Sequence, residues 1–438
     1  MPLSSRIPGF YRLSIERRMR EISQRAELDF EELRATLTEG GLDPDRADKV
    51  VENVLGVYGL PFGVALNFTL NGRDRLVPMV VEEPSVIAAA SNAARMIRNA
   101  GGFETEMVEE LMTTQIQLFD VPDADRAEAA VRGAREELLE LARAAVPKLI
   151  KRGGGPRFLE LRNLGQGVFV IHIHVDCRDA MGANLVNTIA EAVGPRAAEL
   201  TGGQLGLRIL TNLCDRRRVR VTARVRAEDL LPGSGPEAAV EARAAEDGQQ
   251  VIEAIVQASR FAELDPYRAA THNKGIMNGI DSVVIATGND YRAVEAGAHA
   301  YAAQSGRYRP LAVWRREGEQ LFGQLEMPLA LGVVGGTLRV HPTARLALEM
   351  AQIESANDLA QLAAAAGLAS NLAAVRALAT EGIQRGHMSL HARSVAVAAG
   401  ARGGEVDSIA RQLSADRRVD LEHAQRLLAE RRRVHGDE

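Results

Sequence analysis

The sequence predicts an α+β protein in which a large, mainly helical domain carries a smaller inserted domain that contains most of the strands. Three observations predict this class. Helical patterns of apolar residues dominate the first hundred residues and the chain after about residue 250. Between these parts, short segments alternate apolar and polar residues, which is typical of strands with one buried face. The 438 residues are enough for about three structural units of roughly 150 residues each.

Two helices stand out in the first hundred residues. Asp29 and Glu32 can form a capping box that opens one of them. The other begins near Pro84, with proline at the first helical position, and Gly101-Gly102 stops it. This part of the chain is therefore predicted to be mainly helical.

Residues 108–218 are predicted to form the inserted domain. Its elements are a strand at 112–119, a helix at 124–150, strands near 157–162 and at 168–177, a helix at 184–194 and a strand at 205–211. Every second residue of the strand 168–177 is apolar and projects to one face: Phe169, Ile171, Ile173, Val175 and Cys177. The order β-α-β-β-α-β is the split βαβ, or ferredoxin-like, arrangement.

The large domain is predicted to comprise residues 1–107 and 219–375. Residues 219–225 alternate again and return the chain to this domain. The following stretch, 227–247, is rich in Glu, Ala, Gly and Pro and is interpreted as a surface excursion.

Helices are expected from residue 250 to the end of the chain. Glycine-rich turns break them at 275–279, 288 and 332–336. A final helical segment, 404–432, belongs to a small C-terminal unit that we place at residues 376–438.

The composition excludes several classes of protein. The formal net charge of −5, from 53 basic and 58 acidic side chains, argues against a nucleic-acid-binding or membrane-surface protein. Cys177 and Cys214 are too few for a disulfide framework or a zinc knuckle. The first residues lack the apolar core of a signal peptide, and no apolar run, 328–338 included, approaches the roughly 20 residues that span a bilayer. A cytoplasmic protein is therefore expected.

The sequence contains no G-x-G-x-x-G motif that follows a strand, and no P-loop. One other segment could hold a nucleotide, because the strand 168–177 runs through residues 178–184 directly into a helix. Gly182 would let a ligand approach the backbone, and the N–H groups of the helix N-terminus suit a pyrophosphate. The alternative is an ordinary turn in which Asp179 or Asn184 caps the helix.

Glu82 and Glu83 stand at the predicted helix start near Pro84. Alone, they are most simply explained as carboxylates that complement the helix dipole. The alternative is a general acid, because a carboxyl group held in an apolar cleft has a raised pKa and can donate a proton at neutral pH. Spacing does not tell which of the two side chains points inward.

Residues 264–281 form the most unusual stretch, a polar cluster bounded by Gly275 and Gly279. The cluster consists of Arg268, His272, Asn273, Lys274 and Asn278. Polar side chains gathered on a turn between apolar helices favour a binding site over a solvated loop. Lys274 would stabilise a developing oxyanion as a point charge.

Asp290 and His387 are two further candidates. Asp290 precedes a predicted helix and is its natural N-cap, which does not exclude a role beside Lys274. His387 and His391 lie on one helix face, but Met388 stands where an H-E-x-x-H zinc site has glutamate, so no metal is predicted. A role for His387 as a proton donor stays open.

Several segments together carry a resemblance to a known family over nearly the whole chain. They are Ser5–Phe10, Glu52–Gly56, Val81–Ser85, Asp179–Asn184, Arg268–Asp281, Ala286–Asp290 and Gly386–Met388. They are similar to the motifs of the 3-hydroxy-3-methylglutaryl-CoA reductase family, of the bacterial, class II type. Together these motifs are highly specific, whereas any one alone would not be.

The resemblance implies an oxidoreductase that converts 3-hydroxy-3-methylglutaryl-CoA to mevalonate and CoA by two hydride transfers from NADH or NADPH, or runs the reverse. It implies a catalytic set of Glu83, Lys274, Asp290 and His387. Ser85, Arg268 and Asn278 match positions that hold the hydroxymethylglutaryl group. The nicotinamide-nucleotide side is matched by Asp179, Met181, Gly182, Asn184 and Asn212.

The resemblance also implies roles for these residues. Lys274 stabilises the oxyanion, Glu83 donates a proton, and Asp290 lies between them and tunes both. His387 protonates the CoA thiolate, since an ordinary thiol has a pKa of about 8.5. The inserted domain would bind the cofactor, the large domain the substrate, and the C-terminal unit would be a flap that closes over both. The active sites would lie at a homodimer interface, with assembly into a larger oligomer of dimers left open.

One position bears on the choice between NADH and NADPH. NADH-using relatives place an acidic residue in the long helix of the small domain, at the ribose 2′-hydroxyl, and this chain has Val146 there. With Lys151 and Arg152 close by, this favours NADPH or the use of both. The alternative functions are a CoA-thioester hydrolase or acyltransferase, although neither cysteine lies in a nucleophile motif, and a non-catalytic helical assembly protein.

Overall fold

The computed structural model describes residues 3–38, 41–231, 238–380, 392–416 and 418–436. These residues contain nine strands: β1 (Phe62–Leu70), β2 (Arg73–Val80), β3 (Phe103–Phe119), β4 (Gly155–Gly165), β5 (Val168–Asp176), β6 (Gln204–Leu210), β7 (Arg217–Arg226), β8 (Ala312–Glu317) and β9 (Gln320–Pro328).

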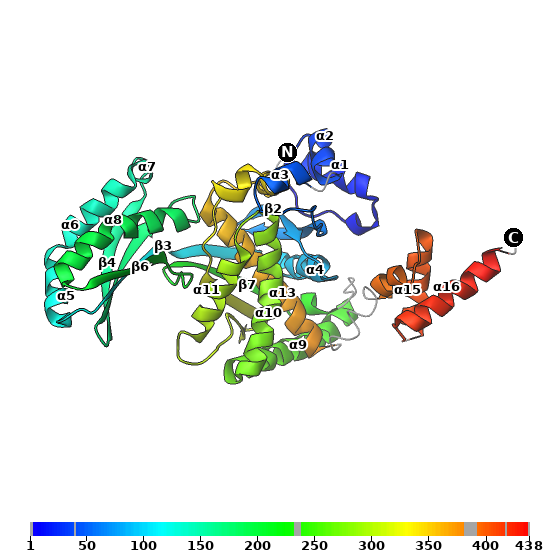
Figure 1. Cartoon of the computed structure of the whole chain (residues 1–438). Coiled ribbons are helices and arrows are strands. Elements are labelled where there is room, and N and C mark those ends of the chain that lie inside the picture. Colours follow the sequence, from blue (N-terminus) through cyan, green and yellow to red (C-terminus); the bar gives the residue numbers. More distant parts are fainter. Residues whose placement is uncertain (1–2, 39–40, 232–237, 381–391, 417, 437–438) are drawn as a thin grey trace.

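The α-helices come before, between and after these strands (Figure 1). They are α1 (Ile15–Ala26), α2 (Phe30–Thr38), α3 (Pro44–Asp48), α4 (Val86–Asn99), α5 (Ala124–Gly133), α6 (Arg135–Ala145), α7 (Pro147–Ile150), α8 (Ala183–Thr201), α9 (Ala238–Leu264), α10 (Pro266–Ala286), α11 (Tyr291–Ala303), α12 (Pro342–Met350), α13 (Ala356–Ala379), α15 (Gly404–Ala415) and α16 (Leu421–Gly436). Short 3-10 helices are η1 (Phe10–Arg12), η2 (Glu228–Leu230) and η3 (Gly336–Arg339), and residues 392–398 are also helical.

The strands form one mixed sheet with helices packed against it. Its main path runs β2-β1-β3-β7-β9-β8, with β1 and β3 parallel and the other neighbours antiparallel. The predicted mixture of helices and strands is therefore confirmed. Helices are the commonest element of the large part, as predicted, but this sheet also runs through it.

Two β-hairpins of the large part are absent from the sequence-based prediction. β1 and β2 are joined by Asn71 and Gly72, both with left-handed backbone (φ 47° and 76°), as a two-residue type I′ turn requires. β8 and β9 are joined by a two-residue loop that begins with Gly318 (φ 61°). Helices are the commonest element of the first hundred residues, as predicted, but the hairpin of β1 and β2 was missed, although Asn-Gly between apolar strands is a strong hairpin signal.

The predicted helix starts lie close to the observed ones. At the start of α2, Asp29 Oδ1 accepts the backbone N–H of Glu32 at 2.8 Å, which is one half of the expected capping box. α4 begins at Val86, two residues after Pro84, and ends just before Gly101-Gly102.

β3 is a strand of 17 residues that joins two parts of the molecule. Residues 103–110 pair with β7, and residues 111–119 pair with β5 on one side and β6 on the other. The outer part has the antiparallel order β6-β3-β5-β4, with α6 and α8 packed on it (Figure 1). Since β3 is continuous, a boundary at residue 108 falls inside a strand, and the division into domains stays a prediction.

The elements of this outer part agree with the prediction except for its first helix. The alternating residues of β5, together with Cys177, are buried in one apolar cluster: Phe169, Ile171, Ile173 and Val175. The helix expected over 124–150 is instead the three helices α5, α6 and α7. The chain leaves the helix at Val146 because a residue before a proline, here Pro147, disfavours helical backbone. α8 begins as expected but continues to Thr201.

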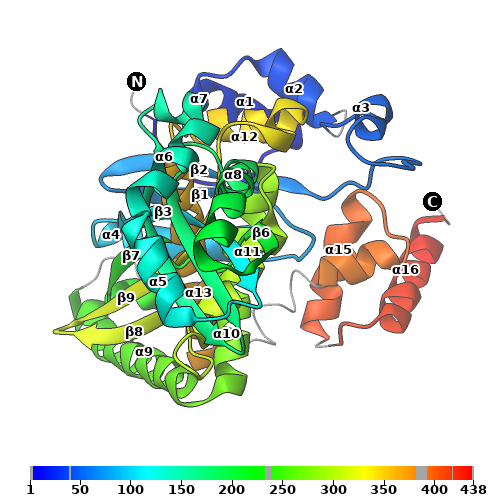
Figure 2. The ribbon, with the colours of Figure 1, turned by 60° about the vertical axis from the view of Figure 1, so that its left-hand side comes forward.

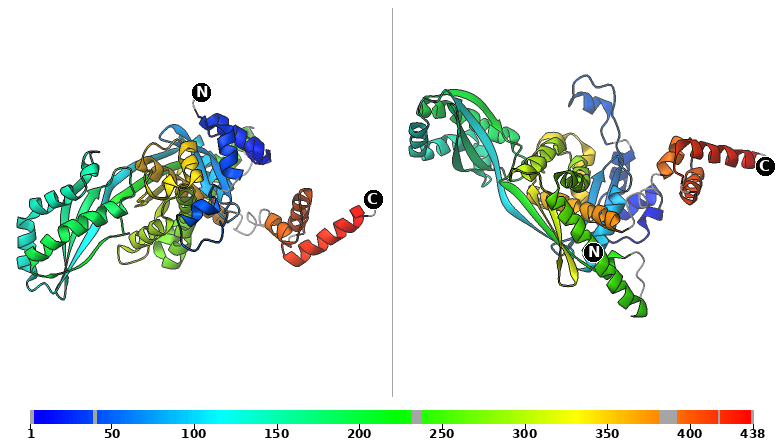
Figure 3. Two further views of the ribbon diagram at one scale, coloured as in Figure 1. Left: turned by 45° about the horizontal axis from the view of Figure 1, so that its top comes forward. Right: turned by 90° about the horizontal axis from the view of Figure 1, so that it is seen from below.

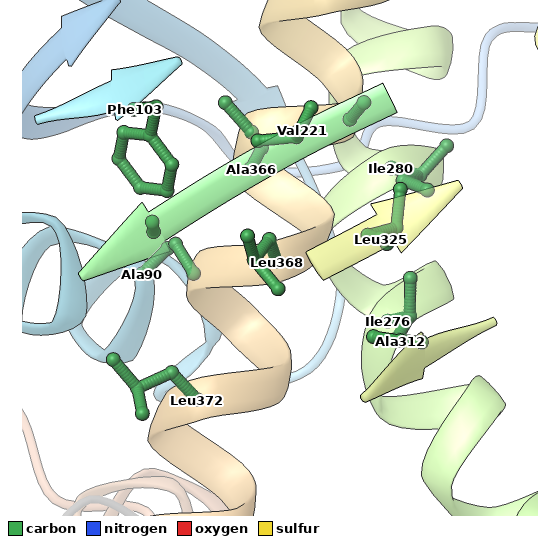
Figure 4. Packing of buried hydrophobic residues seen from close by; sticks show 14 of the residues in the cluster. Ala90, Phe103, Val221, Ile276, Ile280, Ala312, Leu325, Ala366, Leu368 and Leu372 are labelled. Carbon is green, nitrogen blue, oxygen red and sulfur yellow. The ribbon is translucent and has the colours of Figure 1, made fainter. Parts of the chain in front are cut away.

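Gly275 and Gly279 lie inside α10, a continuous helix of 21 residues, and not in a turn. Gly279 lets α10 approach α13, because a Cβ there would lie 2.3 Å from the carbonyl oxygen of Ala366. Gly367 of α13 does the same against Ile280 of α10. The core around this contact is shown in Figure 4, with Val221, Ile276, Ile280, Leu325, Ala366, Leu368 and Leu372. The predicted turn at 275–279 is wrong, since both glycines lie inside the helix and Gly279 serves close helix packing.

α13 is long and apolar enough, by length and composition, to cross a membrane, and no other helix in the described ranges is. The prediction that no such run exists is therefore wrong for residues 356–379. In the structure 67% of the most apolar window of α13 is buried, and the helix packs on α10, α4, α9 and β7. Such burial is typical of the core helix of a globular protein.

The C-terminal helices have an apolar cluster of their own. It includes Ala392, Ala396, Ile409, Leu413, Ala424 and Leu428. Figure 2 shows α15 and α16 apart from the sheet, and Figures 1 and 3 place them at the opposite end of the molecule from α5 and α6. The segment 404–432, expected to be helical, consists of these two helices. The expected surface excursion 227–247 contains η2 and the first turns of α9.

Candidate active site

Two side chains from distant parts of the sequence meet in an ion pair. The ammonium of Lys274 lies 2.8 Å from Oε2 of Glu83. Glu83 stands in the loop between β2 and α4, and Lys274 in the middle of α10. Their side chains are 34% and 62% exposed, so the pair is accessible to a ligand. Of the two carboxylates at this helix start, Glu83 makes the ion pair and Glu82 is exposed.

Buried polar residues fix the orientation of α10. Nε2 of His272 lies 3.0 Å from the carbonyl oxygen of Ala312, and the amide of Asn273 donates to the carbonyl oxygen of Arg309 at 2.9 Å. Burial lowers the pKa of His272 to about 4, so its ring is neutral at physiological pH. These two members of the predicted polar cluster therefore anchor the helix, and the next residue, Lys274, lies on its exposed side.

The three residues expected to hold the substrate lie close in sequence to the ion pair. Ser85 follows Glu83 by two residues and has left-handed backbone (φ 81°), which is uncommon for a side chain other than glycine. Its buried Oγ has no hydrogen-bond partner among the residues described, a feature that is common in ligand sites. Asn278 lies one helical turn after Lys274. Arg268 is half buried, burial lowers its pKa, and no carboxylate in the described ranges pairs with it.

Asp290 does not reach this ion pair within one chain. It is the N-cap of α11, where its Oδ1 accepts two backbone N–H groups at 3.1 Å. From Lys274 to the end of α10 at Ala286 there are 12 residues, about 18 Å of helix. No contact joins Asp290 to Lys274 or Glu83 in the part of the chain that the structure describes. His387 lies outside the described residues.

The residues expected on the cofactor side gather in a second place, at the turn between β5 and α8. Gly182 is the N-cap of α8 with left-handed backbone (φ 108°), and a Cβ there would lie 2.6 Å from Sγ of Cys177. Neither Asp179 nor Asn184 caps the helix with its side chain. Instead, Oδ1 of Asp179 accepts the N–H of Ala356 at the start of α13, at 3.1 Å. The first N–H groups of α8 are therefore available to an anion.

Arg217 holds this turn in place, and the sequence-based candidates do not include it. Its buried guanidinium donates four hydrogen bonds of 2.9 to 3.3 Å to backbone carbonyl oxygens, those of Arg178, Ala180, Met181 and Leu331. Burial lowers the pKa of Arg217, and no carboxylate of the described residues forms an ion pair with it. The sequence did indicate that Arg217 is buried. Side chains alternate between the two faces of a strand, and Arg217 lies on the same face of β7 as the buried Val219 and Val221.

The loop before α11 is linked to the same turn, and the loop before β7 lies against α11. Asn212 is exposed, and its carbonyl oxygen lies against α11. The side chain of Asn289 accepts the N–H of Gly332 at 2.8 Å, and a Cβ on Gly332 would lie 2.5 Å from the backbone nitrogen of Met181. Within one copy of the chain, the segment that contains Asp290 is therefore linked to the turn before α8. Glu83 and Lys274 lie apart from it as a separate pair.

Cys177 and Cys214 are free and buried. Burial raises the pKa of Cys177 to about 12 and that of Cys214 to about 11. A thiol that stays protonated at neutral pH is a poor nucleophile. Neither cysteine therefore offers the nucleophile that thioester hydrolysis or acyl transfer through an enzyme thioester requires.

A partly buried pair of carboxyl groups lies where α10 meets α11. Burial, together with Glu295 of α11, raises the pKa of Asp281 to about 8. An aspartate in an unfolded chain loses its proton near pH 3.9, so between this pH and about 8 the folded state binds more protons. Stability should therefore fall as pH rises through this window.

We expect Asp281→Asn to remove this loss of stability, because an amide does not ionise. The melting temperature of the variant should rise relative to that of the parent protein as pH increases from 5 to 8, by several degrees. Thermal unfolding at pH 5, 6, 7 and 8 measures this, with the exposed Asp48→Asn as the control. Parallel curves for Asp281→Asn and the parent protein would contradict the assignment.

Comparisons with known proteins agree with these observations. The model of the family described as hydroxymethylglutaryl-coenzyme A reductase matches residues 14–392. A 3-hydroxy-3-methylglutaryl-coenzyme A reductase from Archaeoglobus fulgidus is 46% identical over 431 residues, which are 97% of this chain and 94% of the relative. A probable enzyme of the same name from Borreliella burgdorferi is 33% identical over 347 residues, 79% of this chain and 77% of the relative.

Solved structures agree as well. The 3-hydroxy-3-methylglutaryl-coenzyme A reductase from Streptococcus pneumoniae is 40% identical with a TM-score of 0.81, covering 97% of this chain and 99% of that chain. A structure of the class II enzyme from the same species, bound to NADPH in open conformations, is 39% identical with a TM-score of 0.80, covering 85% of this chain and 99% of that chain. Fold and site thus define an oxidoreductase. The chain belongs to the hydroxymethylglutaryl-coenzyme A reductase family.

Proposed function

We propose that the protein interconverts 3-hydroxy-3-methylglutaryl-CoA and mevalonate plus CoA by two successive hydride transfers. The observation that carries this proposal is the ion pair of Glu83 and Lys274, in a chain that matches the family over nearly its whole length. A carbonyl carbon that accepts a hydride leaves negative charge on its oxygen. The pair places a cation to stabilise this charge beside a carboxyl group that can supply a proton.

Lys274 and Glu83 have different tasks in this proposal. The lysine ammonium stabilises the oxyanion, most strongly when the bound substrate has displaced water from the pair. Glu83, whose ion-paired carboxylate must first take up a proton from solvent, passes this proton to the alkoxide formed by the second hydride. Arg268, which has no carboxylate partner among the described residues, suits the free carboxylate of the glutaryl group. The hydroxyl of Ser85, also without a partner in that part of the chain, and the amide of Asn278 are available for hydrogen bonds to it.

The proposal also includes a homodimer with active sites at the interface and a flap formed by residues 376–438. Asp290 lies at the far end of α10 from Lys274, so it can act on this lysine only from a second copy of the chain. His387, carried by the flap, protonates the departing CoA thiolate.

A dimer of this kind predicts complementation between two inactive variants. Lys274→Ala and Asp290→Ala should each be inactive alone. When the two are co-expressed, half of the dimers are mixed, and one of the two sites in each mixed dimer is intact, so activity should recover to about a quarter of the parent value. Turnover of the purified mixture measures this. No recovery in mixed dimers verified by differential tags would show that both residues act from one chain.

We propose that residues 178–184 and Asn212 bind a nicotinamide nucleotide, which supplies the hydride when bound. The fit is supported by the N–H groups at the start of α8, which no side chain caps, and by the left-handed backbone of Gly182, which packs the turn against Cys177. A similar structure is bound to NADPH. In this chain, Asp179, Met181 and Asn184 shape the turn, and Arg217 keeps it in position.

The preference for NADPH is proposed to depend on exposed basic residues rather than on Val146. Val146 is only 4% exposed and packs in the apolar cluster beneath α6, so its side chain does not reach a ligand. Lys151 and Arg152 are exposed, and the loop that they begin touches the turn before α8, since a Cβ on Gly154 would lie 2.9 Å from Cγ of Arg178. Their charges suit a 2′-phosphate.

We expect the double variant Lys151→Glu and Arg152→Glu to lower kcat/KM for NADPH by about 10-fold or more, because two carboxylates repel the 2′-phosphate. The value for NADH should change little. Paired rates with the two cofactors measure this, and Arg126→Glu on exposed α5 controls for net charge. An equal loss of kcat/KM with both cofactors would mean that Lys151 and Arg152 do not contact the 2′-phosphate.

The proposed reaction is tested by incubating the protein with mevalonate, CoA and each oxidised cofactor in turn. A rise in nicotinamide absorbance that requires both mevalonate and CoA is the expected result. In a second incubation with 3-hydroxy-3-methylglutaryl-CoA, release of CoA without a redox change would instead support the alternative function, which the buried cysteines disfavour. We also propose that the protein acts in the cytoplasm, since it needs soluble CoA and nicotinamide nucleotides.

A further inference from the structure

We propose that His172, His174 and Glu160 form a binding site for a divalent transition metal ion of the zinc class. The three side chains lie on the face of the outer sheet opposite to its apolar cluster. Each residue offers one ligand atom, and these three atoms lie within 4.8 Å of one another. Nε2 of His174 is 3.2 Å from Oε2 of Glu160. Neighbouring ligands around zinc, with bonds of about 2.1 Å, are about 3.4 Å apart in a tetrahedron.

The register of the strands produces this arrangement. His172 and His174 are two residues apart on β5 and therefore project from the same face. Glu160 of β4 is the direct cross-strand partner of His172. Because these positions belong to paired strands, the three ligands are held without any loop having to fold around the ion.

The three side chains are of the types that bind transition metals, namely two imidazoles and a carboxylate. This ligand set favours Zn²⁺, Co²⁺ or Ni²⁺ over Mg²⁺ or Ca²⁺.

Polar neighbours orient both rings. Nδ1 of His174 lies 2.9 Å from Oγ1 of Thr113, which can accept its N–H and leave Nε2 for the ion. Nε2 of His172 lies 3.0 Å from the side-chain amide nitrogen of Gln115, so Nδ1 is free for the ion once this amide turns its oxygen toward an Nε2–H. Hydrogen bonds to the second ring nitrogen are typical of histidines that bind metals. The side chain of Glu160 is 45% exposed, so an ion and a completing water can enter from solvent.

Arg216 competes with the ion for Glu160. Its guanidinium lies 3.1 Å from Glu160 and equally 3.1 Å from Glu109. When the ion takes Glu160, Arg216 keeps its ion pair with Glu109, so binding leaves no buried charge without a partner. The other charged groups that act on the two histidines are Arg162 and Asp215. Removing the positive charge of Arg216 should therefore strengthen metal binding.

The test is a titration of the chelator-treated full-length protein with Co²⁺, whose visible absorption reports a four-coordinate site. The parent protein should bind one more equivalent of Co²⁺ than Glu160→Gln does. If the variant still binds this ion, its affinity should be lower by at least about 10-fold. Glu106→Gln, a glutamate of β3 that pairs with Arg220 and not with Arg216, is the control and should keep this equivalent, and Arg216→Gln should bind it more tightly. His172→Ala, a second ligand variant on a partly exposed position, should lose it.

Equal stoichiometry and affinity in the parent protein, Glu160→Gln and His172→Ala would overturn the proposal. So would weaker Co²⁺ binding in Arg216→Gln while Glu160→Gln binds normally. Because the readout is metal absorption and not turnover, either result leaves the proposed reductase activity untouched. Circular dichroism of each variant confirms that the outer sheet is folded.

Discussion

Lys274→Ala should lower kcat for the reduction of 3-hydroxy-3-methylglutaryl-CoA by about 10³-fold or more. The reason is that the variant leaves the oxyanion without its cation, and a single preorganised group of this kind contributes about 10²- to 10³-fold even when it is a neutral donor. The melting temperature should hardly change, because the Lys274 side chain is 62% exposed and its one ion pair is open to solvent. Steady-state rates and thermal unfolding of the same preparation measure both effects.

Two further variants sharpen this prediction. Glu83→Gln should also abolish turnover, since an amide retains the shape of the side chain but cannot donate the required proton. Glu82→Gln, the exposed neighbour, is the matched control and should retain nearly full activity. A near-normal rate in Lys274→Ala would refute the role of the ion pair. Loss of activity in Glu82→Gln would show that the role of Glu83 was assigned to the wrong glutamate.

Arg217→Met should destabilise the protein and weaken cofactor binding together. Methionine leaves the carbonyl oxygens of Arg178, Ala180, Met181 and Leu331 without their donor, which should cost at least about 3 kcal/mol of folding free energy. The turn before α8 then loses its support, so the Kd for NADPH should rise by at least about 10-fold. Denaturant unfolding and fluorescence titration with NADPH measure the two quantities.

The neighbouring Arg218 offers the matched control. Its side chain is 26% exposed, and it pairs with Glu109 and Glu326 on the other face of β7, so Arg218→Met should cost about 1 kcal/mol or less and leave the Kd unchanged. Arg217→Lys restores the charge but cannot reach four carbonyl oxygens, and should repair stability only in part. A stable Arg217→Met protein with a normal Kd would show that the turn needs no such support.

Local patterns predicted the outer part of the molecule well. The alternation in β5 and β7 identifies the buried face, because a strand with one buried face has no other regular pattern. The same rule, applied strictly, would have singled out Arg217 as a charge on the buried side. The hairpin at Asn71-Gly72 also had a local signal, which the helical pattern around it concealed.

Other features depend on contacts that no local pattern contains. Gly275 and Gly279 suggest a turn by composition, but a neighbouring helix decides that they lie within α10. Glu83 and Lys274 are 191 residues apart in sequence, and only the tertiary fold brings them together. Asp290 matches the family motif, yet its separation from Lys274 in one chain becomes visible only when the length of α10 is known.

The ratio of nicotinamide oxidised to CoA released tests the central claim most directly. With 3-hydroxy-3-methylglutaryl-CoA and NADPH, both quantities can be followed in one reaction, by nicotinamide absorbance and by a thiol reagent. The account predicts that two molecules of NADPH are consumed for every thiol that appears. Thiol release with no oxidation of NADPH would mean hydrolysis or acyl transfer, and would contradict a site built to receive two hydrides.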